Sequence, residues 1–133
     1  LYRQTEVLIE NNPHLDSLWI IGHSMGGLIT SLFAEKWENY FPITMHSIAA
    51  PLAGVDRQME GCEKIHRKEY KISNTVNFTQ WKTIHAQDGA FRNLKVDPQE
   101  VYINSGKSIL LPGEWNNTRL GHNRSIQWVC ENL

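Results

Sequence analysis

The chain has 133 residues, of which 41% are apolar and 20% are charged, and its formal net charge is −1. This length allows one domain with a hydrophobic core, and the near-neutral charge gives no reason to expect nucleic acid or an anionic membrane as a partner. No apolar run approaches the roughly 18 residues that a membrane span requires.

The first part of the chain predicts a helix, a strand, a helix and a strand. Residues 1–11 form a helical segment that stops before an Asn-Pro pair. Residues 18–21 are a short apolar run, as expected for a strand buried on both faces of a parallel sheet. From Met25 to about Glu38 the apolar residues recur with a helical period, and residues 43–50 predict a second strand.

The second part is less regular. Residues 54–75 are polar and charged, and we interpret them as a small cap or a helical insertion. Residues 76–85 predict a third strand, and residues 101–103, 109–111 or both supply a fourth. A final helix has the apolar face Ile126, Val129, Cys130 and Leu133. Strands that alternate with helices indicate an α/β fold, with a parallel sheet covered by helices on both faces.

The most specific motif is Gly22-His23-Ser24-Met25-Gly26-Gly27, between the first predicted strand and the helix that follows it. A G-x-S-x-G pattern in this context is typical of a nucleophile elbow, whose sharp turn strains the Ser24 backbone. Gly22 and Gly26 would let the strand and helix pack without Cβ clashes, and the N–H of Met25 could donate to a developing oxyanion. The alternative is a glycine-rich turn with an incidental serine.

Two segments carry a resemblance to a known family. Residues 19–27 (WIIGHSMGG) and 47–54 (SIAAPLAG) resemble the nucleophile elbow and the following strand and turn of α/β-hydrolase lipases and esterases. The resemblance extends from about Asp16 to the end of the chain and is weak between residues 55 and 75. It implies the α/β-hydrolase fold with Ser24 as nucleophile, followed along the chain by an acid and then a histidine.

For the general base we favour His122. It follows the last predicted strand segment and immediately precedes the final helix, where the resembling family carries its histidine. The alternative is an ordinary loop histidine. His23 lies inside the elbow and is expected to point elsewhere, and the other histidines lie within predicted strands or in the wrong chain order: His14, His46, His66 and His85.

For the acid we favour Asp88, because the predicted strand at 76–85 runs into a turn that contains it. This matches the acid position that the resemblance implies. Asp56, after the preceding strand, is the main alternative, since some members of the fold carry their acid there. Asp97 precedes a proline and is interpreted as a turn residue.

The resemblance also implies that the chain is the C-terminal half of a hydrolase domain, from the fifth strand to the last helix. The first four strands and the loop that carries the second oxyanion donor would precede residue 1. The edge of the strand at 18–21 would then be unpaired. We therefore expect residues 1–133 alone to be poorly soluble or oligomeric, and nearly inactive.

Taken together, the sequence predicts a serine hydrolase that cleaves a small-molecule or lipid carboxylic ester through Ser24, Asp88 and His122. The first alternative is a thioesterase, an amidase or an acyltransferase that uses the same triad. The second alternative is a non-catalytic binding protein of the same fold. No metal ion or organic cofactor is implied, because the chain lacks their sequence motifs. A cytoplasmic location is slightly favoured, and the sequence does not predict the oligomeric state.

Overall fold

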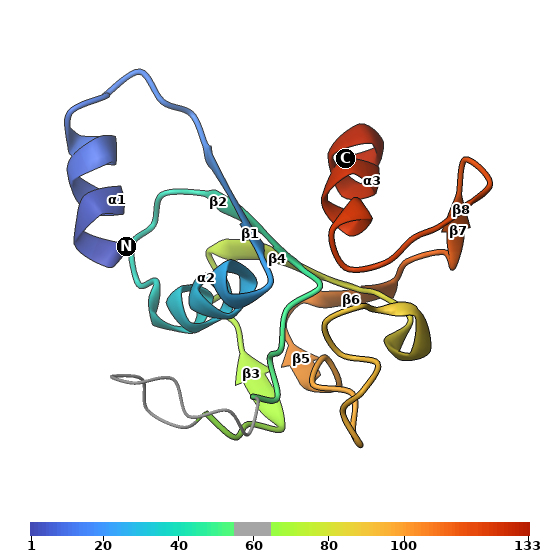
Figure 1. Ribbon diagram of the computed structural model, residues 1–133. Coiled ribbons are helices and arrows are strands. Elements are labelled where there is room, and N and C mark those ends of the chain that lie inside the picture. Colours follow the sequence, from blue (N-terminus) through green and yellow to red (C-terminus); the bar gives the residue numbers. More distant parts are fainter. Residues whose placement is uncertain (55–64) are drawn as a thin grey trace.

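The computed structural model describes residues 1–54 and 65–133, which adopt an α/β fold (Figure 1). A four-stranded, all-parallel sheet has the order β1–β2–β4–β6. Its strands are β1 (Leu18–His23), β2 (Ile43–Ile48), β4 (Val76–Lys82) and β6 (Lys107–Leu110). Within the described residues β1 pairs with β2 alone, so its other edge is unpaired.

Three α-helices, one short 3-10 helix (His85–Gln87) and two small strand pairs complete the described regular structure. The α-helices are α1 (Tyr2–Glu10), α2 (Met25–Lys36) and α3 (Arg124–Asn132). The parallel pair consists of β3 (Glu69–Lys71) and β5 (Tyr102–Asn104), and the antiparallel hairpin consists of β7 (Glu114–Trp115) and β8 (Thr118–Arg119). None of these helices is long and apolar enough to cross a membrane.

The larger core lies between the sheet and helices α1 and α2. Residues alternate across each strand, so the paired positions Ile20, Met45 and Phe78 share one face of β1, β2 and β4. Helix α2 covers this face. Helix α1 packs against α2 through Tyr2, whose ring centroid lies 5.7 Å from that of Phe33. Burying apolar side chains of this size contributes about 1.5–3 kcal/mol each.

Helix α3 covers the opposite face of the sheet, as Figure 1 shows. A second core forms there, and the ring centroids of Trp81 in β4 and Trp128 in α3 lie 6.2 Å apart. Its fully buried members are Ile48, Ala49, Leu111, Leu120 and Val129. The predicted parallel sheet with helices on both faces is therefore confirmed.

The prediction that β1 is buried on both faces is wrong. Trp19 and Ile21 are 54% and 46% exposed. They lie on the face opposite α2, where α3 packs over β2 and β4 and leaves β1 uncovered. An apolar run indicates a strand here, but it does not indicate how many layers cover that strand.

The connections between strands also differ from the expected alternation with helices. Both segments proposed as the fourth strand form strands, but only β6 joins the main sheet, while β5 pairs with β3. Only the β1–β2 connection contains an α-helix within the described residues. Part of the predicted cap, residues 55–64, lies outside the described residues, and the rest contains β3.

His46 on β2 is buried on the face that α3 covers, with 5% of its surface exposed. Its ring lies between Trp19 and Trp81, at centroid distances of 5.4 and 6.0 Å. Its Nδ1 accepts a hydrogen bond of 3.0 Å from the Trp81 indole N–H, while its buried Nε2 has no partner. Burial lowers the pKa of His46, because a charged ring there would lose its hydration.

This environment predicts a pH-dependent stability. The pKa of His46 is lower in the folded protein than in the unfolded chain. Between these two pKa values the unfolded chain therefore binds more protons than the folded protein. The free energy of unfolding should therefore fall as the pH decreases from about 7 through the reference histidine pKa of about 6.5. Urea denaturation at a series of pH values measures this slope. His46→Gln should reduce it, whereas His14→Gln, at an exposed position, should not. Equal slopes in the wild type and His46→Gln would contradict this account.

Candidate active site

The turn between β1 and α2 places Ser24 at the carboxyl end of the parallel sheet. Ser24 has φ 54° and ψ −123°, a conformation that residues with a side chain rarely adopt. Its N–H donates to the Ile48 carbonyl at 2.9 Å, which ties the turn to the end of β2. The strained backbone predicted for this serine is therefore present. Among the described hydrogen bonds, none involves the Ser24 hydroxyl or joins it to His122.

Two glycines allow the helix to approach the strand: Gly22, as predicted, and Gly27 in place of Gly26. A Cβ on Gly22 would overlap the Thr30 hydroxyl and the Gly26 carbonyl. A Cβ on Gly27 would lie 2.6 Å from the Ala50 Cβ. A Cβ on Gly26 would meet nothing within 4 Å, so the prediction that close packing requires Gly26 is wrong.

This difference predicts opposite outcomes for two adjacent alanine substitutions. Gly27→Ala should lower the free energy of unfolding by about 1–3 kcal/mol, since overpacking of this kind forces side chains and backbone to shift. Gly26→Ala should leave stability unchanged or raise it by a few tenths of a kcal/mol, because alanine is a better helix former than glycine. Urea denaturation of the two variants measures both values. A Gly26→Ala variant as unstable as Gly27→Ala would contradict the assignment.

Helix α2 begins at Met25, immediately after Ser24. The first N–H groups of a helix have no acceptor within it, and they carry its positive dipole end. The Met25 N–H is one of these groups. It therefore can donate to an oxyanion that forms beside Ser24, as the sequence predicts.

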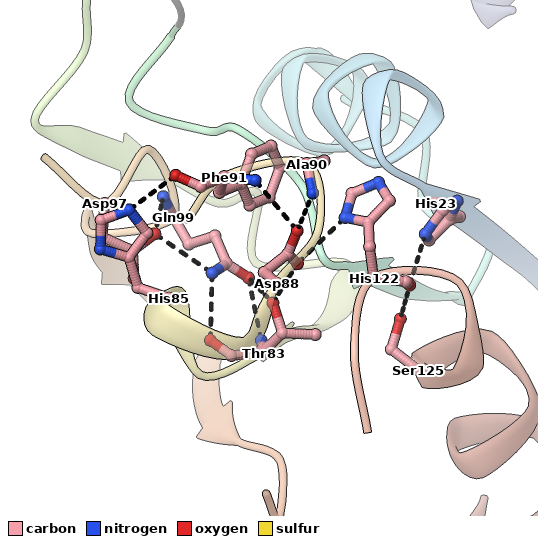
Figure 2. A network of polar contacts seen from close by, with 10 residues as sticks. All are labelled: His23, Thr83, His85, Asp88, Ala90, Phe91, Asp97, Gln99, His122 and Ser125. Carbon is pink, nitrogen blue, oxygen red and sulfur yellow. Dashed lines mark hydrogen bonds and ion pairs between the residues drawn. The ribbon is translucent and has the colours of Figure 1, made fainter. Parts of the chain in front are cut away.

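Asp88 follows a single 3-10 turn (His85–Gln87) after β4 and has no exposed surface. One carboxylate oxygen accepts the backbone N–H groups of Ala90 and Phe91, at 2.8 and 3.1 Å. The other accepts the Thr83 hydroxyl at 2.5 Å and His122 Nδ1 at 3.0 Å. Figure 2 shows the carboxylate between these groups. Four donors therefore fix both of its oxygens.

These contacts keep Asp88 ionised. Burial by itself would raise the pKa of the carboxyl group, but hydrogen bonds from His122, Thr83 and Ala90 outweigh burial, and the pKa is lowered. The ionised group therefore stabilises the fold above its ordinary pKa. That stabilisation is lost as the pH falls through the lowered folded-state pKa.

His122 lies in the loop between β8 and α3, with 13% of its side chain exposed. Because Asp88 accepts the hydrogen of Nδ1, the neutral ring has its lone pair on Nε2. The ring is held between Phe91, at a centroid distance of 5.0 Å, and His23, at 4.6 Å. The structure thus brings together the predicted acid and the predicted base in an orientation that leaves one basic nitrogen free.

The prediction that His23 points elsewhere is wrong. Its Nε2 lies 3.0 Å from the carbonyl oxygen of His122, and the two rings are in contact (Figure 2). Burial lowers the pKa of His23 against the opposing effect of this hydrogen bond, so the ring is neutral at pH 7 and donates from Nε2. His23 precedes Ser24 in the chain. This contact therefore joins the turn of the predicted nucleophile to the loop of the predicted base.

The other candidates occupy different places. Asp97 accepts the backbone and side-chain N–H groups of Gln99, at 3.0 and 3.1 Å, which makes it part of a turn. His85 begins the 3-10 turn, not the end of a strand as predicted, and its Nε2 lies 2.8 Å from the Phe91 carbonyl. Asp56, the alternative acid, lies outside the described residues.

Sequence analysis missed the polar side chains that surround Asp88. Thr83 and Gln99 are buried beside it, and neither belongs to a recognisable motif. The only available signal was the position of Thr83, in the segment that leads from the predicted strand into the acid turn.

The described residues contain no group of three or more His, Cys, Asp or Glu side chains placed to hold a metal ion. Comparisons of the chain with protein-family models, with curated proteins and with solved structures found no match. The functional assignment therefore depends on the geometry of the site itself.

Proposed function

We propose that this protein is a serine hydrolase of the α/β-hydrolase fold that cleaves carboxylic esters. The observation that carries the proposal is the buried, ionised Asp88, which holds the ring of His122 with Nε2 free, beside the turn of Ser24. A serine hydroxyl is a weak nucleophile unless a base accepts its proton. A histidine oriented by a carboxylate is the usual means of supplying that base.

In the proposed reaction the Ser24 oxygen attacks the ester carbonyl carbon, and its proton passes to His122 Nε2. The imidazolium then protonates the leaving alcohol as the C–O bond breaks, which leaves an acyl group on Ser24. Water then attacks the acyl carbonyl carbon and gives a proton to Nε2. Nε2 returns this proton to the Ser24 oxygen as the bond from that oxygen to the acyl carbon breaks, which releases the acid and restores the Ser24 hydroxyl. Asp88 stays ionised throughout and stabilises the transient imidazolium.

The Met25 N–H supports the same reaction, since it can donate to the oxygen that gains negative charge in each tetrahedral intermediate. Removal of one such donor typically costs about 2.7–4 kcal/mol of transition-state stabilisation. His23 acts on the loop that carries the base. Its hydrogen bond to the His122 carbonyl keeps the base loop against the nucleophile turn.

A substrate panel tests the class of bond that is cleaved. This assay and the activity and labelling assays below use the full-length protein, with any segment that precedes residue 1 included. Aryl esters, alkyl esters, thioesters and anilides of the same short acyl chain are offered to the wild type and to Ser24→Ala. We expect hydrolysis of esters that depends on Ser24, with slower or no hydrolysis of the anilide. Faster hydrolysis of the thioester would instead favour a thioesterase. Turnover that is equal in the wild type and Ser24→Ala would contradict the proposal.

A further inference from the structure

Gln99 makes an unusual set of contacts at the end of β4. Its side chain is fully buried. The amide oxygen accepts the Thr83 backbone N–H at 2.9 Å, and the amide nitrogen donates to the Thr83 carbonyl at 3.1 Å. The Gln99 side chain therefore pairs with both backbone groups of Thr83, immediately after the last residue of β4, in the way that a neighbouring strand would.

Gln99 is itself anchored from two sides. Its amide nitrogen and its backbone N–H both donate to the Asp97 carboxylate. Its carbonyl accepts a hydrogen bond of 2.7 Å from the side chain of Gln80, a residue of β4, and Gln80 in turn accepts the Ser108 hydroxyl of β6. The amide is thus held in a single orientation by the sheet and by the turn that contains Asp97.

The Thr83 hydroxyl connects this arrangement to the proposed acid. Its oxygen lies 2.5 Å from Asp88 Oδ2 and 3.1 Å from Gln99 Oε1, but a hydroxyl has one hydrogen to donate. The ionised carboxylate is the closer and the stronger acceptor, so the hydrogen goes to Asp88. Gln99 Oε1 is satisfied by the Thr83 N–H instead.

We propose that Gln99 is a positioning residue that fixes Thr83 so that its hydroxyl holds the Asp88 carboxylate towards His122. The inference deepens the proposed hydrolase function and rests on it. Loss of the Thr83 hydrogen bond removes one of the two groups that hold Asp88 Oδ2, so the carboxylate can turn away from His122. A carboxylate that is not held in place stabilises the imidazolium of His122 less and orients its ring less firmly, so the variants lose the ring proton at lower pH than the wild type.

The test follows two quantities in Thr83→Val, Thr83→Ser and Gln99→Met. The first is the pH midpoint of the histidine ring signals of His122 by NMR, which requires no activity. The second is the pH dependence of the rate at which a fluorophosphonate labels Ser24. Thr83→Val and Gln99→Met should move both midpoints to lower pH by roughly 0.5–1 unit, and should slow labelling about 10-fold to 100-fold. Thr83→Ser, which keeps the hydroxyl, should restore the wild-type midpoints.

Three comparisons separate positioning from loss of structure. Tyr70→Phe removes a buried hydroxyl that donates to the Leu52 carbonyl, outside this network, and should leave the midpoints unchanged. Combining Thr83→Val with Gln99→Met should shift the midpoints no further than either change alone, because both act through one hydrogen bond. If Gln99→Met does not fold, Asp97→Ala, which removes the acceptor of both Gln99 N–H groups at a less buried position, takes its place.

Wild-type midpoints in a folded Gln99→Met or Asp97→Ala variant would overturn the inference. A wild-type protein that is not labelled at Ser24 would contradict the hydrolase proposal alone. In that case the NMR midpoint of His122 still decides whether Gln99 and Thr83 position Asp88.

Discussion

Replacing Ser24 by alanine is expected to lower kcat for ester hydrolysis by about 10⁴-fold or more, because no other hydroxyl can take the place of the nucleophile. The free energy of unfolding should stay close to that of the wild type. Alanine carries the same Cβ through the same φ of 54°, and the serine hydroxyl contributes no hydrogen bond in the described structure. Steady-state kinetics and urea denaturation of the purified variant measure the two effects.

Two further variants sharpen this result. Glycine adopts positive φ without strain, so Ser24→Gly should abolish activity and yet raise the free energy of unfolding by about 1 kcal/mol. Ser17→Ala, at an exposed serine in the same chain segment, should leave both quantities unchanged. A Ser24→Ala variant that keeps more than a tenth of the activity would show that another residue is the nucleophile.

Replacing Asp88 by asparagine is expected to lower kcat by about 10²-fold to 10⁴-fold. The asparagine oxygen can still accept the N–H groups of Ala90 and Phe91. Its NH₂ group would then face His122, where it can only donate. This favours the tautomer with hydrogen on Nε2, which cannot accept the proton of Ser24.

The matched control is Asp56→Asn, which makes the same replacement of a carboxylate by an amide at the alternative acid. We expect this variant to lose no more than a few-fold in kcat, since Asp88 already supplies the partner of His122. If Asp56→Asn proves the more damaging substitution, the acid follows β2, and the contact between Asp88 and His122 has a structural role only.

The parts of the fold that the sequence predicted well are those with a local cause. The run at residues 18–21 and the helical period after Met25 located β1 and α2, and the glycine pattern located the strained turn between them. Chain order, position after the predicted strands and the family resemblance together selected Asp88 and His122, and the structure places Asp88 Oδ2 and His122 Nδ1 3.0 Å apart.

The features that the sequence did not predict depend on contacts between distant segments. His23 contacts His122, which is 99 positions away in the chain, and Gln99 contacts Thr83, which is 16 positions away. No local pattern predicts either contact. Trp19 is exposed because no helix packs over it, and Gly26 could carry a side chain because no other group lies near the position of a Cβ there. Both facts depend on which elements pack nearby, not on the neighbouring residues in the chain.

The central claim is that Ser24 is a nucleophile activated by His122. Its most direct test is the reaction of the full-length protein with a fluorophosphonate at about pH 7.5, above the reference histidine pKa of about 6.5, followed by intact-mass measurement and peptide mapping. We predict one phosphonyl adduct per chain, on Ser24, whose formation is slowed strongly in His122→Gln and absent in Ser24→Ala. An unlabelled wild-type protein, or an adduct on a different residue, would contradict the account.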